Sequence, residues 1–264
     1  MTEPRPITSR YNPRVRRALR LRSRKGRTQQ GRTLVDGVRE LSRAMAANIP
    51  IDEVFVCETL CGSEQSQQVL AELEAGATAI WQVTDQVFDR LAFGDRHEGM
   101  VAVVRPPQRS LSAIHLPANP LVAVLEGVEK PGNLGAVLRS ADGAGVAAVV
   151  VAGGGTDLFN PAAIRASLGT IFHVPVCSAT ADETFSWLTA QRLRIVAAHP
   201  EGARLYTGVD YRAGTAVVLG SEATGLSPRW RMAPCEGIRL PQLGVANSLT
   251  VAAAAAVLFY EALR

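Results

Sequence analysis

The sequence predicts an α/β protein with two domains, the second larger and built on a parallel sheet. In the second half of the chain, near-continuous apolar strands alternate with helical segments, which is typical of a parallel sheet covered on both faces. In the first half, shorter strands and helices alternate and end at a polar stretch. A chain of 264 residues is long enough for both domains.

The smaller domain is expected over residues 33–107, after a basic arm at 1–32. A strand begins at Thr33, and the turn around Asn48 separates the first helix from the next strand. The apolar periodicity predicts helices at about 37–47, 63–76 and 84–92 and strands at 53–57, 79–83 and 100–107. The arm is partly amphipathic between about 10 and 30, a pattern compatible with a helix. Residues 108–119 are polar and turn-rich, and we predict a linker there.

The larger domain is expected over residues 120–264. Its β-branched, apolar runs predict strands at 121–128, 146–153, 193–198 and 215–221, with a short strand near 237–240. The intervening patterns predict helices within 131–145 and at 160–171, 183–192 and 251–263. The alternation of the two kinds of segment indicates a parallel sheet with helices on both faces.

Composition argues against several classes of protein. No segment approaches the roughly 20 apolar residues of a membrane span, and the basic N-terminus lacks the apolar core of a secretory signal. The four cysteines are dispersed and form no C-x-x-C pair, so we expect no metal, with a local Cys57–Cys61 bridge as the alternative. We expect a reducing, cytoplasmic location.

Positive charge is concentrated at the N-terminus. Residues 1–32 hold eleven basic residues and one acidic residue, whereas the net charge of the whole chain is only +4. Clustered arginines are typical of nucleic-acid binding, because the guanidinium group suits phosphate oxygens. A solubilising tail is the alternative interpretation. The residues expected to contact the nucleic acid, RNA or DNA, are Arg14, Arg16, Arg17, Arg24, Lys25 and Arg27.

Three glycine-containing loops are predicted to follow strands of the parallel sheet: GVEKPGNLGA (127–136), LGSEATGLS (219–227) and LPQLGVANSL (240–249). Parallel sheets bind ligands at the carboxyl ends of their strands. None of the loops matches the G-x-G-x-x-G or P-loop pattern, which disfavours a dinucleotide or nucleoside triphosphate. A ligand site at these loops is the prediction, and ordinary turn chemistry is the alternative.

The helix within 131–145 carries an unusual row of residues. Gly135, Arg139 and Gly143 lie four residues apart and therefore share one side of the helix. Each interior glycine costs roughly 1 kcal/mol relative to alanine. We interpret the row as space through which Arg139 reaches a phosphate or ribose of a nucleic acid. The alternative is an exposed Arg139–Asp142 pair, one helical turn apart.

In their order and spacing, three segments resemble the motifs of the SpoU (TrmH-like) family of SPOUT RNA 2′-O-ribose methyltransferases. They are NLGAVLRSA (133–141), GSEATGL (220–226) and LPQLGVANSLTVA (240–252). The stretch RKGRTQQGRTLVDGVREL (24–41) is similar to the start of the family's L30e-like substrate-binding domain. The resemblance implies methylation of a ribose 2′-oxygen in RNA by S-adenosylmethionine, a C-terminal trefoil knot and a homodimer.

The resemblance also assigns site residues. Asn133, Arg139 and Glu222 match the polar active-site positions. The positions expected at the cofactor are Gly220, Leu240 and Leu249, with Leu219, Gly244 and Ser248 beside them. The third motif departs from the family's usual Ser-Leu-Asn, because Thr250 offers a hydroxyl group but no amide.

Roles for these residues follow from chemistry. Arg139 stays protonated, so positioning a phosphate and stabilising negative charge suit it better than acting as the base. Glu222 is expected to orient Asn133 or accept the ribose proton, with capping of a following helix as the alternative. Ser248 is expected to N-cap the terminal helix.

The substrate class follows from the arm and the L30e-like domain, which favour ribosomal RNA of the large subunit (23S rRNA) over tRNA. A tRNA 2′-O-methyltransferase and a catalytically silent RNA-binding paralogue remain as alternatives, the second motivated by Thr250. A generic nucleotide-binding α/β enzyme is a third alternative.

Overall fold

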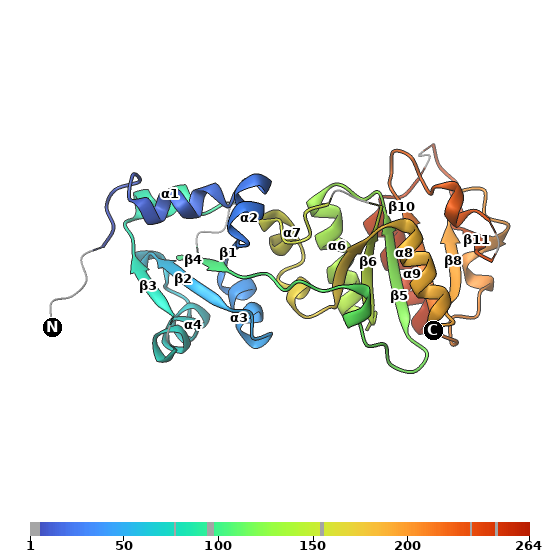
Figure 1. The fold of residues 1–264 in the computed structure, drawn as a ribbon, viewed down its shortest axis with the longest axis horizontal. Helices are drawn as coiled ribbons and strands as arrows, with labels where there is room; N and C mark the ends of the chain where they lie inside the picture. Colours follow the sequence, from blue (N-terminus) through green and yellow to red (C-terminus); the bar gives the residue numbers. More distant parts are fainter. Residues whose placement is uncertain (1–5, 77, 94–97, 154–155, 233, 246–247) are drawn as a thin grey trace. The chain divides into compact units, whose positions relative to one another are not determined.

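The chain folds as two compact units (Figure 1). The computed structural model describes residues 6–76, 78–93, 98–153, 156–232, 234–245 and 248–264. One unit runs to Pro107 and also includes Phe159–Phe172, and the other comprises Gln108–Leu158 and His173–Arg264. Residues 1–5 of the predicted arm, and 246 and 247 of the third predicted loop, lie outside the described residues.

The first unit contains a four-stranded sheet in the order β1-β4-β2-β3. Its strands are β1 (Thr33–Asp36), β2 (Ile51–Val56), β3 (Ala79–Gln82) and β4 (Met100–Val104). Strand β4 is antiparallel to both of its neighbours, and β2 and β3 are parallel. All residues of β4 are buried, because it is an inner strand with helices packed around the sheet.

The basic arm is folded as part of this unit. Helix α1 (Pro13–Arg20) starts at Asn12, whose side chain accepts a hydrogen bond from the Arg14 N–H. Its apolar residues Val15 and Ala18 are buried in the same core cluster as Phe55 and Phe88. The remaining N-terminal helices are α2 (Arg24–Gln30), α3 (Val38–Ala46), α4 (Glu64–Ala75) and α5 (Asp85–Leu91). The described part of the arm therefore forms two helices, of which α1 buries an apolar side.

A segment from the second half of the sequence completes the first unit. We predicted the helix near 160–171 as a cover of the parallel sheet, but α7 (Pro161–Ala166) packs against β1 instead. The Thr33 hydroxyl donates to the Phe159 carbonyl at 2.6 Å, and Arg165 pairs with the buried Asp36 carboxylate at 3.1 Å. These polar contacts explain the placement, since a buried carboxylate requires partners.

The second unit is built on a seven-stranded sheet in the order β7-β6-β5-β10-β8-β11-β9. All of its neighbouring strands are parallel. The strands are β5 (Leu121–Glu126), β6 (Ala148–Ala152), β7 (Val176–Ala179), β8 (Arg194–Ala198), β9 (Arg204–Leu205), β10 (Thr215–Gly220) and β11 (Glu236–Arg239). The parallel sheet was predicted; β7 and β9 were not, because they are short and partly exposed.

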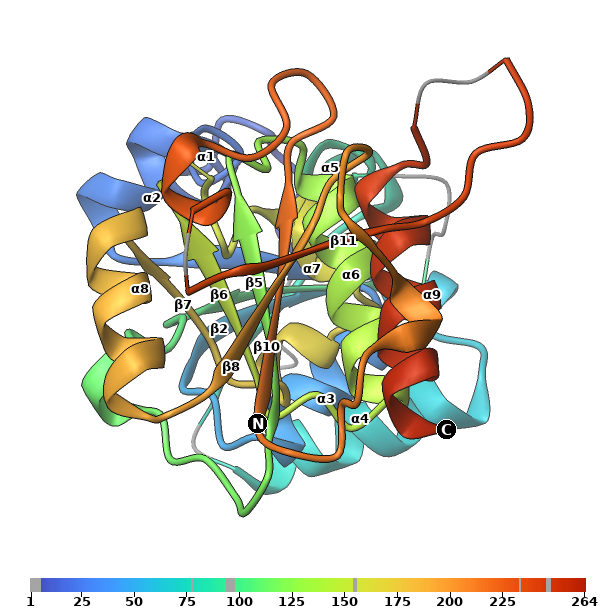
Figure 2. The ribbon, with the colours of Figure 1, turned by 90° about the vertical axis from the view of Figure 1, so that its right-hand side faces the viewer.

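Helices cover both faces of this sheet (Figure 2). Helix α8 (Ala181–Ala190) lies on one face, and α6 (Pro131–Gly143) and α9 (Val251–Leu263) pack together on the other. One core cluster joins alternate strand residues to Leu188 of α8 and to Trp230. The predicted α/β class, with a smaller domain before a parallel-sheet domain, is confirmed. No described helix combines the length and apolar character needed to cross a bilayer.

Candidate active site

A cavity of about 330 Å³ lies where several loops of the second unit meet. Its walls come from the carboxyl ends of β8 and β10, the segment after β11 and the first turns of α9. Six of the predicted site residues line it: Leu219, Gly220, Glu222, Leu240, Ser248 and Leu249. The remaining predicted cofactor residue, Gly244, is exposed on the loop after β11 and is not among the lining residues.

The loop after β10 is closed tightly on itself. Ser221 and Gly225 form an isolated β-bridge, and Gly225 has a φ of +65°, which favours glycine. A Cβ atom on Gly220 would lie 2.4 Å from the Gly225 carbonyl carbon. Both glycines are thus required by the backbone of the loop itself, which holds the neighbouring Glu222 at the cavity.

Glu222, in the second predicted loop, is bonded to the first loop and to the start of α9. Its Oε1 atom accepts a hydrogen bond from the Asn133 side-chain amide at 3.1 Å and another from the Val251 N–H at 3.2 Å. Its Oε2 atom lies 3.9 Å from the Lys130 ammonium group. Glu222 therefore orients Asn133, as predicted, and also binds the first N–H group of α9, where the helix dipole favours a negative charge.

The start of α9 differs from the prediction. We expected Ser248 to be its N-cap, but the helix begins at Val251 and the N-cap is Thr250. The Thr250 hydroxyl accepts the Ala253 N–H at 3.3 Å, while Ser248 lines the cavity. An N-cap bonds the backbone two or three residues ahead, so the helix boundary decides which hydroxyl serves.

Glu126 is a functional residue that the sequence analysis missed. It ends β5, is 8% exposed, and accepts three hydrogen bonds from the segment after the Glu222 loop. The donors are the Ser227 N–H at 2.7 Å, the Ser227 hydroxyl at 2.7 Å and the Trp230 indole N–H at 2.9 Å. A carboxylate at the end of the apolar run LVAVL was the signal available in the sequence. Glu126 anchors the loop to the central sheet.

Arg139 lies on the exposed side of α6. Within the described part of the chain, its guanidinium group makes no hydrogen bond or ion pair. The alternative Arg139–Asp142 pair is wrong, because Asp142 bonds the His173 ring at 2.7 Å. At Gly143 the glycine row has a purpose other than the one proposed above. A Cβ atom at this position would lie 3.0 Å from the Tyr260 hydroxyl of α9. That end of the row allows two helices to approach.

These features make a pocket with an apolar wall and one carboxylate bonded to Asn133 and to the start of α9, while the Arg139 guanidinium group is exposed on α6. Comparison with known proteins shows which family has these features. Residues 120–260 match the SpoU rRNA Methylase family, and residues 12–102 match the MRM3-like substrate binding domain. The chain belongs to the SpoU rRNA methylase family.

Relatives within the SpoU rRNA methylase family cover nearly the whole chain. The 23S rRNA (uridine(2479)-2′-O)-methyltransferase of Streptomyces viridochromogenes is 30% identical over 253 residues, which are 92% of this chain and 86% of the relative. The 23S rRNA (guanosine(2553)-2′-O)-methyltransferase RlmP of Bacillus subtilis is 26% identical over 255 residues, 97% of this chain and 98% of RlmP. The predicted family is confirmed.

Solved structures have the same fold. An RNA 2′-O ribose methyltransferase superposes with a TM-score of 0.86 and 39% identity, covering 98% of both chains. The SpoU methyltransferase AviRb of Streptomyces viridochromogenes, in complex with the cofactor AdoMet, gives a TM-score of 0.86 at 28% identity. That superposition covers 96% of this chain and 97% of AviRb.

The residues predicted to contact RNA in this SpoU family member fall into two groups. Arg14 and Arg17 pair with Glu53, and Arg14 also stacks on the Trp81 ring at 3.8 Å. Arg27 is buried and donates to the Leu21 carbonyl at 2.6 Å. The second group, Arg16, Arg24 and Lys25, is exposed on α1 and α2. Arg14, Arg17 and Arg27 therefore make contacts that stabilise the first unit.

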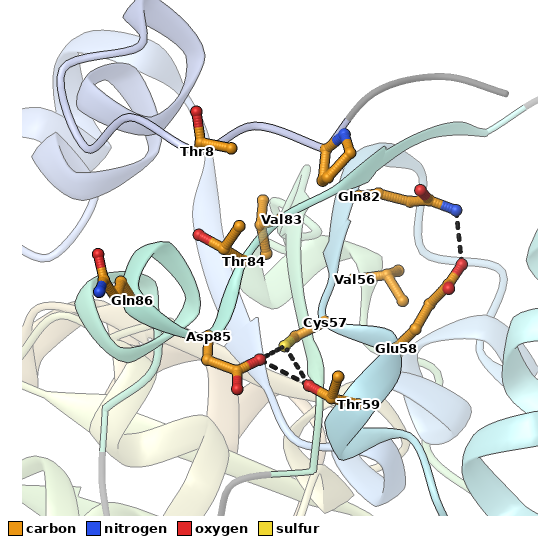
Figure 3. Close-up of a pocket in the computed structure, with 11 residues that line it drawn as sticks. Thr8, Val56, Cys57, Glu58, Thr59, Gln82, Val83, Thr84, Asp85 and Gln86 are labelled. Atoms are coloured by element: carbon orange, nitrogen blue, oxygen red, sulfur yellow. Dashed lines mark hydrogen bonds between the residues drawn. The ribbon is translucent and has the colours of Figure 1, made fainter. Parts of the chain in front are cut away.

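A second cavity, of about 540 Å³, lies in the first unit at the ends of β2 and β3 (Figure 3). The Cys57 thiol and the Thr59 hydroxyl both donate to Asp85 Oδ1, at 2.9 and 2.6 Å. Burial raises the pKa of Cys57, and the two donors lower the pKa of Asp85. A raised pKa disfavours the thiolate, which is the nucleophilic form of cysteine.

The cavity of the second unit suits S-adenosylmethionine. Leu219, Leu240 and Leu249 offer an apolar wall for a nucleoside. Glu222 supplies a negative charge, which suits the donor's cationic groups. Among the described residues no group of three or more metal-ligating side chains is present.

Proposed function

We propose that this chain methylates a ribose 2′-oxygen in 23S rRNA with S-adenosylmethionine as the methyl donor. As a SpoU family member the chain is an RNA 2′-O-methyltransferase that uses S-adenosylmethionine. The large-subunit target is supported by the names of the relatives above, which are 23S rRNA enzymes. The observation that carries the proposal is the Glu222 carboxylate, which joins Asn133 and the start of α9 at the cavity wall.

The residues around the cavity divide the chemistry between them. When bound, S-adenosylmethionine supplies an electrophilic methyl group and leaves as a neutral thioether. Leu219, Leu240 and Leu249 hold the donor against the ends of the strands. The harder task is the activation of the ribose hydroxyl, which requires correct positioning and removal of its proton.

Glu222 and Arg139 act on the ribose hydroxyl. Oε1 of Glu222 is occupied by two hydrogen bonds. Oε2, beside Lys130, is the atom that accepts the ribose proton, directly or through a water molecule. Arg139, which stays protonated, binds the adjacent phosphate and stabilises the negative charge that develops on the oxygen.

Two features of assembly belong to this proposal. A second copy of the chain covers the exposed apolar side of α9, formed by Val257, Tyr260 and Leu263, and the homodimer completes the RNA site. The chain also threads through itself as a trefoil knot. In support, β11 lies between β8 and β9 in the sheet. After β8 ends at Ala198, the chain therefore passes the position that β11 later occupies to form β9, and then returns to form β10 on the other side of β8. Such threading is rare in folds.

The first unit is the RNA-binding part of the proposed enzyme. Its match to a substrate binding domain and its exposed basic residues Arg16, Arg24 and Lys25 support this assignment. We place the predicted domain boundaries at residues 33–107 and 120–264, with α7 contributing to the first unit. The proposal places the enzyme in the cytoplasm, where ribosomal RNA is available.

Transfer of a labelled methyl group tests the proposal. The purified chain is incubated with methyl-labelled S-adenosylmethionine and either 23S rRNA or bulk tRNA, both lacking the modification. Label in a 2′-O-methylnucleoside of 23S rRNA is the expected result. Label in tRNA alone would support the tRNA enzyme instead, and donor binding without transfer to any RNA would support a silent paralogue with Thr250 in place of asparagine.

A further inference from the structure

Arg231 is placed at the cavity by a rigid part of the loop. It follows the short 3₁₀ helix η5 (Pro228–Trp230), and its N–H donates to the Pro228 carbonyl at 3.1 Å. The preceding residue, Trp230, is fully buried, and its indole is held by Glu126. The backbone of Arg231 is therefore fixed to the central sheet.

The guanidinium group of Arg231 lies at the cavity itself. Arg231 is a lining residue, together with His199 and Gly225. Its Nη2 atom is 3.5 Å from the point that a Cβ atom of Gly225 would occupy. Burial and the charge of Arg231 both lower the pKa of His199, which keeps this ring neutral at physiological pH. Arg231 is thus the cation on this side of the cavity.

Arg231 differs from its neighbour in the same loop. The Arg229 guanidinium lies 3.5 Å from the centre of the Phe185 ring and pairs with Asp182 at 3.4 Å. Arg231 makes no side-chain hydrogen bond or ion pair with any residue that the structure describes. Glu222, the one acidic residue among the described lining residues, is already bound by Asn133, Val251 and Lys130. The positive charge of Arg231 is left for a ligand.

We infer that Arg231 binds the carboxylate of the amino-acid half of the methyl donor. S-adenosylmethionine carries one anionic group, the α-carboxylate, and guanidinium groups bind carboxylates through paired, charge-assisted hydrogen bonds. The inference rests on the proposed use of S-adenosylmethionine. It adds a residue that follows the second motif and that the three motifs do not include.

An RNA phosphate is the competing ligand for Arg231. The observations favour the donor, because Arg231 lines the same cavity as Leu219, Leu240 and Leu249. Arg139 is the guanidinium that lies outside that lining on the exposed side of α6. We therefore assign the phosphate to Arg139 and the carboxylate to Arg231.

Calorimetry on the full chain with two ligands tests this assignment. S-adenosylhomocysteine carries the amino-acid half, and 5′-deoxy-5′-methylthioadenosine lacks it. Arg231→Met is expected to weaken S-adenosylhomocysteine binding by roughly 10- to 100-fold, as expected for a charged hydrogen-bonded pair, and to leave methylthioadenosine binding unchanged. Arg231→Lys is expected to recover part of the loss, because it restores the charge without the paired geometry.

The control is Arg212→Met, which removes an exposed cation whose ion-pair partner among the described residues is Asp210. This variant is expected to bind both ligands like the wild type. Equal weakening of both ligands by Arg231→Met, or no effect on either, would overturn the inference. Weaker RNA binding with unchanged S-adenosylhomocysteine binding would overturn it in favour of a phosphate contact. If the wild-type chain bound neither S-adenosylmethionine nor S-adenosylhomocysteine, the proposed function itself would fail.

Discussion

At the scale of single residues, the charged groups of the site differ in how many hydrogen bonds and ion pairs they make within the protein. Glu222 is bonded to Asn133, Val251 and Lys130. Arg139 and Arg231 have no charged partner among the described residues. A charge satisfied by the protein maintains the fold, and a charge without a partner is available to a ligand. We propose that Arg139 and Arg231 bind RNA and donor, whereas Glu222 positions Asn133 through Oε1 and accepts the ribose proton at Oε2.

Arg139→Ala is expected to remove catalysis without affecting the fold. Because Arg139 is exposed and makes no side-chain contact with a described polar group, the melting temperature and the affinity for S-adenosylmethionine should stay at their wild-type values. The rate of methyl transfer should fall by about a hundredfold or more, as on loss of a group that stabilises developing charge. Single-turnover transfer to 23S rRNA measures the rate, with Arg212→Met as the control. Near-normal transfer would exclude a catalytic role.

The predictability of the site also differs from residue to residue. Asn133, Arg139 and Glu222 were found from motifs, because each lies within a recognisable short segment. Glu126 and Arg231 lie just outside those segments, and only the folded chain brings them to the loop that they fix or the cavity that they line. The N-cap was misplaced by two residues, because both Ser248 and Thr250 are good caps and periodicity does not set a helix boundary that finely.

At the scale of elements, β5 fixes the Glu222 loop through Glu126. Glu126→Leu would leave three donors of Ser227 and Trp230 without an acceptor, at a cost of about 1–3 kcal/mol for each buried group. We expect the melting temperature to fall by several degrees and S-adenosylmethionine binding to weaken. Differential scanning calorimetry and titration measure the two effects. The exposed Glu129→Gln is the control, and a Glu126→Leu variant with wild-type stability would contradict the anchoring role.

The contact between β1 and α7 predicts a pH dependence. Burial raises the pKa of Asp36 to about 6, and the Phe93 N–H and Arg165 oppose this only in part. The folded state therefore holds the proton more tightly than the unfolded state, whose carboxyl group titrates near 3.8. The stability of the first unit should fall, by at most about 3 kcal/mol, as the pH rises from about 4 through 6.

Asp36→Asn should flatten this dependence, because the amide does not titrate. Urea unfolding midpoints at pH 4.5 and 7, measured for the wild type and the variant, provide the check. An unchanged slope in Asp36→Asn would show that other groups cause the dependence. The same contact explains why the sequence misplaced α7. Its apolar pattern fits either sheet, and its place is decided by the pairing of Arg165 with a carboxylate 129 positions away.

At the scale of the whole molecule, the order of strands and helices was largely predictable, because long apolar strands are a strong signal of a parallel sheet. The short strands β7 and β9 were not, since two to four partly exposed residues leave little pattern. The position of β11 between β8 and β9 in the sheet has no signal in the local sequence. Only resemblance to a family gave reason to expect a knot.

The proposed function requires that the methyl donor binds in the cavity of the second unit. A crystal structure of the full chain grown with S-adenosylmethionine tests this most directly. We predict the donor in this cavity, against Leu219, Leu240 and Leu249, with its carboxylate at Arg231. A donor bound elsewhere on the chain, or a cavity that stays closed to it at saturating concentration, would contradict the account.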